Sequence, residues 1–307
     1  MKIEFMCNAQ PVKTKIMFLI DHDGCIADTN SVKDDKLGAF TRNFFYKNYS
    51  LKNTDATDEN LNKIHHDMYG QPMGNIFKAI AEKYYESIVA QNSEELKENP
   101  SFKITGAEVT NALNEYIKDY YGSRPEFPNA TKLLSALSAI GTCYIVTGME
   151  TDLIAQSLNN KDWIKFFENK DGKLRIYGAE GGPYSPGESV SKSKNIATIQ
   201  QENGNSKDIS YISFGDANSE RVSSLNAGAT FFKVCHPGQK LASQWVNEPQ
   251  NEISKSIDDL FLVIRKKVSP LLTKEKLKIF NEAYGKITTD SSLIKSKTNN
   301  VKINSPQ

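Results

Sequence analysis

The sequence predicts an α/β fold: a doubly wound, Rossmann-like parallel sheet with an inserted α-helical cap domain. Two observations lead to this class. Short apolar runs near 17–20, 143–148 and 209–216 suit strands buried on both faces, as parallel strands are. Segments with helical spacing separate them, and strands that alternate with helices form βαβ units whose strand ends share one edge of the sheet.

The remaining core elements are predicted from the spacing of apolar residues and from the glycines that end helices. Leu133, Leu134 and Leu137 lie on one face of a helix expected over 127–140, which Gly141 ends. The later elements, in chain order, are one helix over about 151–168, a glycine- and proline-rich loop up to 187, a helix from about 192, a helix after 216 that Gly228 ends, a strand over 230–234 and a last core helix over 257–268.

The block at 30–126 carries apolar residues at three- and four-residue spacings and few strand signals. Such a long helical block directly after a buried strand predicts a separate lobe. We therefore expect a core domain of residues 10–28 plus 127–268, a helical cap domain at 29–126 and a C-terminal extension at 269–307. The end of this extension lacks a hydrophobic pattern and is expected to be disordered.

Composition narrows the range of partners. The 307 residues include 38 basic and 37 acidic side chains, a net charge of +1 that gives no electrostatic reason to expect nucleic acid as a partner. No apolar run approaches the roughly 20 residues that span a bilayer. The four cysteines are scattered without a CxxC pair, which favours reduced thiols and a cytoplasmic location.

Acidic side chains follow two of the predicted strands. Asp21 and Asp23 come directly after the first strand, and Asp216 and Glu220 follow the strand at 209–216. Open parallel sheets bind ligands beyond the carboxyl ends of their strands. Carboxylates held close together need a cation between them or a shared proton, and hard oxygen ligands suit Mg²⁺. The pattern therefore predicts a Mg²⁺ site.

A hydroxyl group and an amine complete the set of candidate site residues. Thr147 closes the second strand, and Lys192 and Lys194 begin a helix. Ile196 and Ile199 lie four and seven residues after Lys192, on one helical face, which favours Lys192 over Lys194. With the carboxylates, these groups are typical of a site for Mg²⁺-assisted phosphoryl transfer.

The ordered set resembles the motifs of the haloacid-dehalogenase (HAD) superfamily. Its first motif usually reads DxDGT[LV]xD[ST], and residues 21–29 read DHDGCIADT. The second motif is a Thr or Ser that closes an apolar strand, here IVT, the third is the lysine, and the fourth is a GDxxxD-like segment, here GDANSE. FPNATKLL at 127–134 resembles members with a helical cap between the first two motifs, the phosphoglycolate phosphatase and β-phosphoglucomutase-like subclass.

The resemblance implies a Mg²⁺-dependent phosphomonoester hydrolase that acts on a small phosphorylated metabolite through an aspartyl-phosphate intermediate. Asp21 would be the nucleophile, Asp23 the general acid and base, Thr147 would orient the phosphoryl group, and Lys192 would neutralise charge. The resemblance further assigns phosphate binding to Gly24, Gly148, Thr147 and Lys192, and metal binding to Asp21, Asp23 (through its backbone carbonyl), Asp216 and Glu220.

Two residues depart from the family pattern. Cys25 stands where threonine is usual, and Glu220 stands where aspartate is commoner, so that Glu220 contacts either the metal or a metal-bound water. Asp23 argues against dehalogenases, which lack this acid, and against transport ATPases, which have threonine there. The alternatives are a sugar-phosphate mutase, a phosphotyrosine phosphatase, and a binding or regulatory module that has lost turnover.

Overall fold

The computed structural model describes residues 15–28, 125–179, 192–239, 245 and 247–285, and the single positions 63, 67, 79, 82 and 111. The cap domain expected at 29–126 and the tail after 285 lie outside the described residues, apart from these positions and 125–126. All five single positions are helical. Lys63 and Asp67 form an exposed ion pair of 2.6 Å, one helical turn apart.

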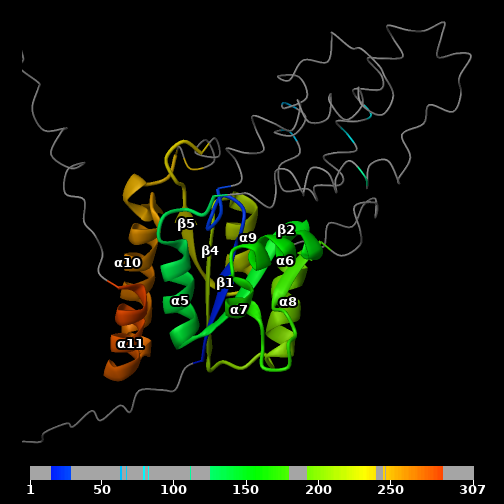
Figure 1. Ribbon diagram of the computed structural model, residues 1–307. Coiled ribbons are helices and arrows are strands. Elements are labelled where there is room, and N and C mark those ends of the chain that lie inside the picture. The colour runs from blue at the N-terminus through cyan, green and yellow to red at the C-terminus, as the bar shows by residue number, and fades with distance from the viewer. Residues whose placement is uncertain are drawn as a thin grey trace, which may run out of the picture.

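The centre of the molecule is a sheet of six parallel strands in the order β3-β2-β1-β4-β5-β6 (Figure 1). The chain winds outward from β1 in one direction and then in the other, which is the doubly wound topology. The order reverses between β1 and β4, where such folds bind ligands beyond the strand ends. The strands are β1 Lys15–Ile20, β2 Thr142–Glu150, β3 Ile176–Ala179, β4 Ile209–Gly215, β5 Thr230–Val234 and β6 Ile253–Ser254.

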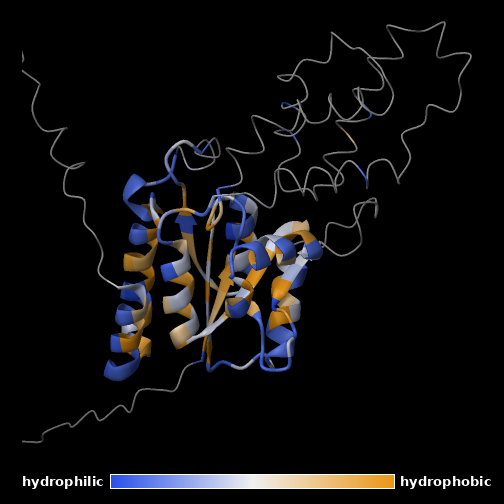
Figure 2. Ribbon diagram, in the orientation of Figure 1, coloured by the Kyte–Doolittle hydropathy of each residue, from blue (hydrophilic) through white to orange (hydrophobic). Residues whose placement is uncertain are grey.

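Helices cover both faces of this sheet (Figure 1). One face is covered by α5 Ala130–Ile140, α6 Thr151–Asn160, α7 Ile164–Phe167, α10 Ile257–Val268 and α11 Lys274–Tyr284. The other is covered by α8 Lys192–Glu202 and α9 Asn218–Asn226. Two short 3₁₀ turns, η3 Gln250–Glu252 and η4 Ser269–Leu271, complete the described elements. Figure 2 shows largely hydrophobic strands between helices in which hydrophobic and hydrophilic residues are mixed.

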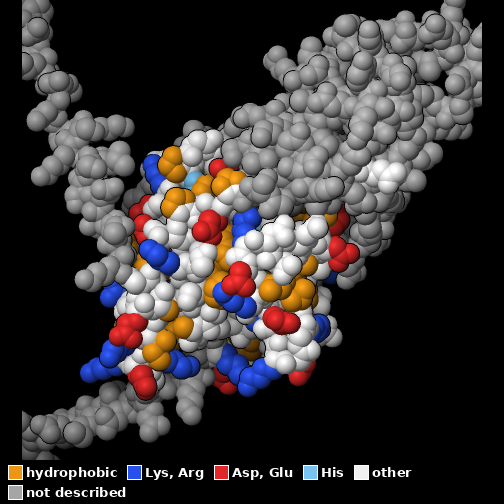
Figure 3. Space-filling model, viewed as in Figure 1, with side chains coloured by type: hydrophobic (Ala, Val, Ile, Leu, Met, Phe, Trp, Pro, Cys, Tyr) orange, Lys and Arg blue, Asp and Glu red, His pale blue; other side chains and the backbone are white. Residues whose placement is uncertain are grey.

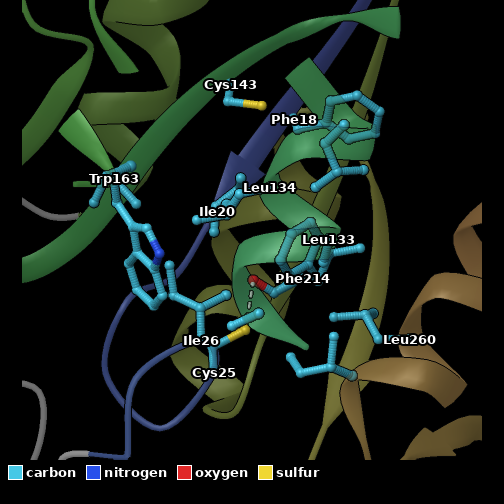
Figure 4. Close-up of a cluster of buried hydrophobic side chains, with 14 of the residues drawn as sticks. Phe18, Ile20, Cys25, Ile26, Leu133, Leu134, Cys143, Trp163, Phe214 and Leu260 are labelled. Carbon is cyan, nitrogen blue, oxygen red and sulfur yellow. Dashed lines mark hydrogen bonds between the residues drawn. The ribbon is translucent and has the colours of Figure 1, made fainter. Parts of the chain in front are cut away.

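The side chains of β1 divide the core into two layers because successive side chains of a strand point to opposite faces. Phe18 and Ile20 are fully buried and pack with α5, while Met17 and Leu19 pack against α8. Figure 4 shows the first layer, in which side chains from β1, β4, α5 and α10 meet. Complete burial of such side chains contributes about 1.5–3 kcal/mol each. This burial on both faces holds β1, and therefore the loop that follows it, at the centre of the fold.

The single helix expected over 151–168 is divided into α6 and α7. Asp162 adopts the left-handed conformation with φ 55° and donates its backbone N–H to Asn159, while Trp163 donates its own to Leu158. These two hydrogen bonds form a Schellman motif, which ends a helix. The Trp163 side chain is fully buried. The hydrophobic spacing continues through this break, which explains why the sequence pattern did not reveal it.

The core continues beyond residue 268, the boundary expected from the sequence. Phe280 and Tyr284 of α11 are buried and stack on Phe261 of α10, with ring centroids 4.9 and 3.8 Å apart. These two rings lie one turn apart in a helix that is otherwise rich in Lys and Glu, so the apolar stripe is narrow. Strands β3 and β6 were also missed, since they have four and two residues.

The chain leaves the core and returns to it at adjacent points. Asp28 donates its backbone N–H to the carbonyl of Pro125 at 3.0 Å, and Phe127 donates its own to Ile26 at 3.1 Å. The two segments thus run antiparallel, with a bridge between them. Residues 29–124 are therefore an insertion between neighbouring points of the core, and Asp28 lies at its entrance.

The visible surface of the described core is mixed in character. Basic and acidic side chains alternate over it, and the apolar areas between them are small (Figure 3). Within the described ranges, no helix has the length and apolar character needed to cross a membrane.

Candidate active site

Three buried carboxylates meet at the carboxyl edge of the sheet, beside the point where the strand order reverses. Asp21 follows β1, Asp216 follows β4, and Glu220 lies in the first turn of α9. Their side chains each offer an oxygen, and these oxygens all lie within 4.8 Å of one another. All three residues are at most 7% exposed. Acids almost 200 positions apart in the sequence thus form one cluster.

Lys192, the first residue of α8, brings a positive charge to this cluster. Its ammonium donates to Asp21 Oδ1 at 2.8 Å and also forms an ion pair with Glu220. Lys194 is exposed. Of the two lysines considered from the sequence, the structure therefore places Lys192 at the carboxylates. Asp21, Lys192 and Glu220 also line a narrow pocket below the strand ends.

The charges of the cluster do not balance, because three carboxylates face one ammonium. Burial raises the pKa of Asp21 to about 8, and the charge of Glu220 adds to this effect, while Lys192 opposes it. Burial and the same neighbouring acids raise the pKa of Asp216 well above its ordinary value. Burial alone would lower the pKa of Lys192, but Asp21 and Glu220 raise it. A divalent cation among these oxygens would supply the missing positive charge.

Two glycines make room for the carboxylates. Gly24 has φ +72°, which a residue with a Cβ adopts only under strain. A Cβ there would lie 2.0 Å from Asp216 Oδ2, and a Cβ at Gly215 would lie 2.1 Å from Glu220 Oε2. The backbone at both glycines therefore approaches the acids more closely than any other residue type would allow. This close approach suits a site that gathers oxygen ligands around a small cation.

Asp23 lies beside the three-acid cluster and is not one of its members. Its carboxylate is 2.9 Å from Nδ1 of His22, and 17% of its side chain is exposed. His22 is fully buried, and its Nε2 lies 3.4 Å from the hydroxyl of Ser157 in α6. The histidine thus fixes the direction of the Asp23 side chain. Of the two acids in the loop after β1, Asp21 is the more enclosed and Asp23 the more accessible.

Thr147 lies in β2 at the same edge of the sheet and is buried. Its Oγ1 accepts a hydrogen bond from the backbone N–H of Met149 at 3.1 Å. A hydroxyl that accepts in this way keeps its own hydrogen available for donation. Gly148, expected to contribute to phosphate binding, lies between these two residues and is half-buried.

Both departures from the family motif have a structural account. Cys25 is fully buried, and its thiol lies 3.9 Å from the carbonyl of Phe214, so that the weaker thiol donor stands where a hydroxyl is usual. Glu220 uses both of its oxygens: one pairs with Lys192, and Oε2 accepts the backbone N–H of Ala217 at 3.0 Å. These contacts fix the position of the Glu220 carboxylate beside Asp21 and Asp216.

Three residues near the site were missed by sequence reasoning. Trp245 Nε1 donates to the carbonyl of Asp216 at 3.0 Å, while His236 and Gln239, just after β5, reach the loop that follows β1. Their positions match no motif. The only available signal was that 235–239 follows a strand of the same sheet and therefore reaches the same edge.

Comparisons with known proteins agree with this architecture. No family model and no curated protein matches the sequence. Among solved structures, a candidate haloacid-dehalogenase-like hydrolase of Burkholderia xenovorans is similar with a TM-score of 0.52 and 16% identity, covering 85% of this chain and 100% of its own. A candidate phosphatase of Clostridium difficile is similar with a TM-score of 0.51 and 17% identity, covering 82% and 99%.

A third structure is a candidate HAD hydrolase of Bacillus subtilis bound to magnesium. Its TM-score is 0.50 with 14% identity, and the match covers 82% of this chain and 99% of that one. At these sequence identities the likeness concerns the fold. The same fold follows from the order of the strands in the sheet and from the helices on its two faces. The chain therefore has the fold of the haloacid-dehalogenase-like hydrolases.

Proposed function

We propose that this protein is a Mg²⁺-dependent phosphomonoester hydrolase that acts on a small phosphorylated metabolite through an aspartyl-phosphate at Asp21. The observation that carries the proposal is the contact of Lys192 with Asp21 at 2.8 Å, inside a buried cluster of three carboxylates. This cluster lies at the strand ends of a fold shared with HAD hydrolases. The contact joins the predicted nucleophile to the charge that would offset an incoming phosphoryl group.

In the first step, a carboxylate oxygen of Asp21 attacks phosphorus, and the bond from phosphorus to the ester oxygen breaks. Asp23 is the better proton donor to the leaving oxygen because it is more accessible and is held by His22. In the second step, Asp23 takes a proton from a water that attacks the phosphoryl group. Inorganic phosphate then leaves, and Asp21 is regenerated.

Lys192 and Thr147 would hold the oxygens of the transferring group. The Lys192 ammonium already donates a hydrogen bond to Asp21, so a phosphoryl group bound to Asp21 would lie beside this ammonium. The hydroxyl hydrogen of Thr147 is available because its oxygen accepts from Met149. Donors held in place before the reaction are worth about 10²–10³-fold in rate each.

The residues present fit a magnesium ion. Asp21 and Asp216 are hard oxygen donors, their cluster carries more carboxylates than the single ammonium of Lys192 can balance, and Gly24 lets the Asp216 carboxylate approach where a Cβ would collide with it. Glu220 would contact the ion directly or through a water, with Lys192 and the backbone N–H of Ala217 holding its carboxylate in place. When bound, Mg²⁺ would offset the negative charge of the phosphoryl oxygens and of Asp21.

The test is hydrolysis of p-nitrophenyl phosphate and of a panel of phosphorylated metabolites, with Mg²⁺ and with EDTA. Wild-type protein should release inorganic phosphate only with Mg²⁺, and Asp21→Asn should remove this activity. Asp152→Asn, an exposed position in the first turn of α6, is the matched control and should retain it. Full activity of Asp21→Asn would reject the mechanism, and isomerised sugar phosphate without free phosphate would indicate a mutase.

A further inference from the structure

The turn after β5 lies against the loop that carries the two catalytic aspartates. Gln239 Nε2 donates to the carbonyl of Gly24 at 2.5 Å, and His236 Nε2 lies 2.9 Å from the carbonyl of Cys25. Both side chains are buried, at 8% and 5% exposure. Two successive carbonyls directly after Asp23 therefore have partners more than 200 positions further along the chain.

The amide of Gln239 can have only one orientation here. Its Oε1 accepts the backbone N–H of His236 at 2.8 Å, so its NH₂ group faces Gly24. The backbone N–H of Gln239 in turn donates to the carbonyl of His236 at 3.2 Å, which closes the turn. The donor is thus fixed before it meets the loop, and little conformational entropy is lost in keeping it there.

The imidazole of His236 is held from a second direction. It stacks on Phe127, with ring centroids 3.6 Å apart and planes inclined by 18°. Phe127 also donates its backbone N–H to Ile26. The loop after β1 is therefore held along three consecutive carbonyls, by Gln239, His236 and the backbone of residue 127.

Gly24 lies between Gln239 and Asp216, the proposed metal ligand. A Cβ at Gly24 would be 3.0 Å from Gln239 Nε2 and 2.0 Å from Asp216 Oδ2. A shift of the Gly24 peptide would therefore change the distance between the loop that carries Asp21 and Asp23 and the carboxylate of Asp216. On the Asp216 side, the indole N–H of Trp245 donates a hydrogen bond to the backbone carbonyl of Asp216.

From these contacts we infer that Gln239 and His236 are positioning residues, which hold the loop of Asp21 and Asp23 at its working distance from Asp216. The inference rests on the proposed function for its catalytic meaning. Neither side chain touches the reacting groups, so both act through the backbone of residues 24 and 25. Outer partners of this kind typically change metal affinity or activity by about 10- to 100-fold when they are removed.

The experiment compares Gln239→Met with Gln200→Met. Gln200 offers a matched control because its Nε2 also donates to a backbone carbonyl, that of Ala227 at 2.8 Å, away from the site. Both changes keep side-chain length and remove one such bond, and Gln239→Met also removes the acceptor of the His236 backbone N–H, a bond within the same turn. Three measurements follow: deuterium uptake by the peptide that covers 18–28, kcat and KM for p-nitrophenyl phosphate, and the Mg²⁺ concentration for half-maximal activity.

We expect faster deuterium uptake at 18–28 in Gln239→Met alone, with kcat lowered about tenfold or more, KM within about twofold, and the Mg²⁺ midpoint raised about tenfold. Equal loop exchange and equal kcat in the two variants would overturn the inference. If Gln239→Met does not fold, the same measurements on His236→Phe test the inference. This change keeps an aromatic ring beside Phe127 and removes the imidazole N–H that faces the carbonyl of Cys25.

The two proposals can fail separately. Wild-type protein that hydrolyses no phosphoester would refute the proposed function, but the exchange comparison would still decide whether Gln239 holds the loop. An active wild type with unchanged loop exchange and kcat in both Gln239→Met and His236→Phe would refute positioning alone.

Discussion

Replacing Gly24 with alanine separates backbone strain from a collision at the active site. Gly24 has φ +72°, and an alanine in this conformation costs about 1–2 kcal/mol. The new Cβ would lie 2.0 Å from Asp216 Oδ2, whereas real Cβ contacts stay above 3.0 Å. The carboxylate oxygen must therefore move by about 1 Å, a displacement that can cost on the order of 100-fold in rate.

Gly228→Ala is the control, since it has nearly the same conformation without the collision. Its φ is +71°, and a Cβ there would meet nothing within 4 Å. Gly228→Ala should lose about 1–2 kcal/mol in denaturant unfolding, and Gly24→Ala should lose at least as much, because its Cβ would also lie 2.9 Å from Asp216 Cγ. Only Gly24→Ala should lose about 100-fold in kcat with Mg²⁺. If the two variants hydrolyse p-nitrophenyl phosphate within about threefold of each other, the argument from close approach is refuted.

Three further predictions concern charge, pH and the C-terminal helix. Lys192→Met should lower kcat by at least about 100-fold because it removes the cation on Asp21, whereas Lys194→Met should stay within about twofold of wild type. Since burial raises the pKa of Asp21 from 3.8 to about 8, the metal-free fold should lose stability as the pH rises from about 4 to 8, and Mg²⁺ should raise the Tm more at pH 8 than at pH 5. Phe280→Ala should lower the free energy of unfolding by about 3–5 kcal/mol because this ring is fully buried against Phe261.

Each of these predictions has a clear contradicting result. Equal losses of kcat in Lys192→Met and Lys194→Met would show that the α8 lysine contact is irrelevant to turnover. A Mg²⁺-induced rise in Tm that is the same at both pH values would mean that the carboxylates do not hold protons in the metal-free fold. A loss below about 1 kcal/mol in Phe280→Ala would place α11 outside the cooperative core.

The four longer strands, β1, β2, β4 and β5, and the acidic cluster were the most predictable parts of the chain. The expected strand at 230–234 and the expected helix at 257–268 agree with β5 and α10. A strand that is buried on both faces has an unbroken run of apolar residues, which can be recognised from the local sequence. Asp21 and Asp216 stand directly after two such runs. Their meeting followed from topology, because parallel strands place their carboxyl ends at one edge.

The features that were missed depend on backbone conformation or on long-range contacts. The break between α6 and α7 rests on the left-handed φ of Asp162, a backbone conformation that the spacing of apolar residues does not encode. The partners of the loop after β1 come from Gln239 and His236, which contact backbone carbonyls. A carbonyl is present at every position, so such contacts leave no pattern in side-chain type along the chain.

The antiparallel contact between residues 28 and 125 has a consequence for engineering. Neighbouring antiparallel strands place Cα atoms about 4.5–5.5 Å apart, and each added residue spans about 3.3–3.6 Å when extended. A bridge of two or three residues could thus replace everything between these positions without changing the register of β1 or the start of α5. The segment between these positions could therefore be removed or exchanged while the loop that carries Asp21 and Asp23 keeps its place in the core.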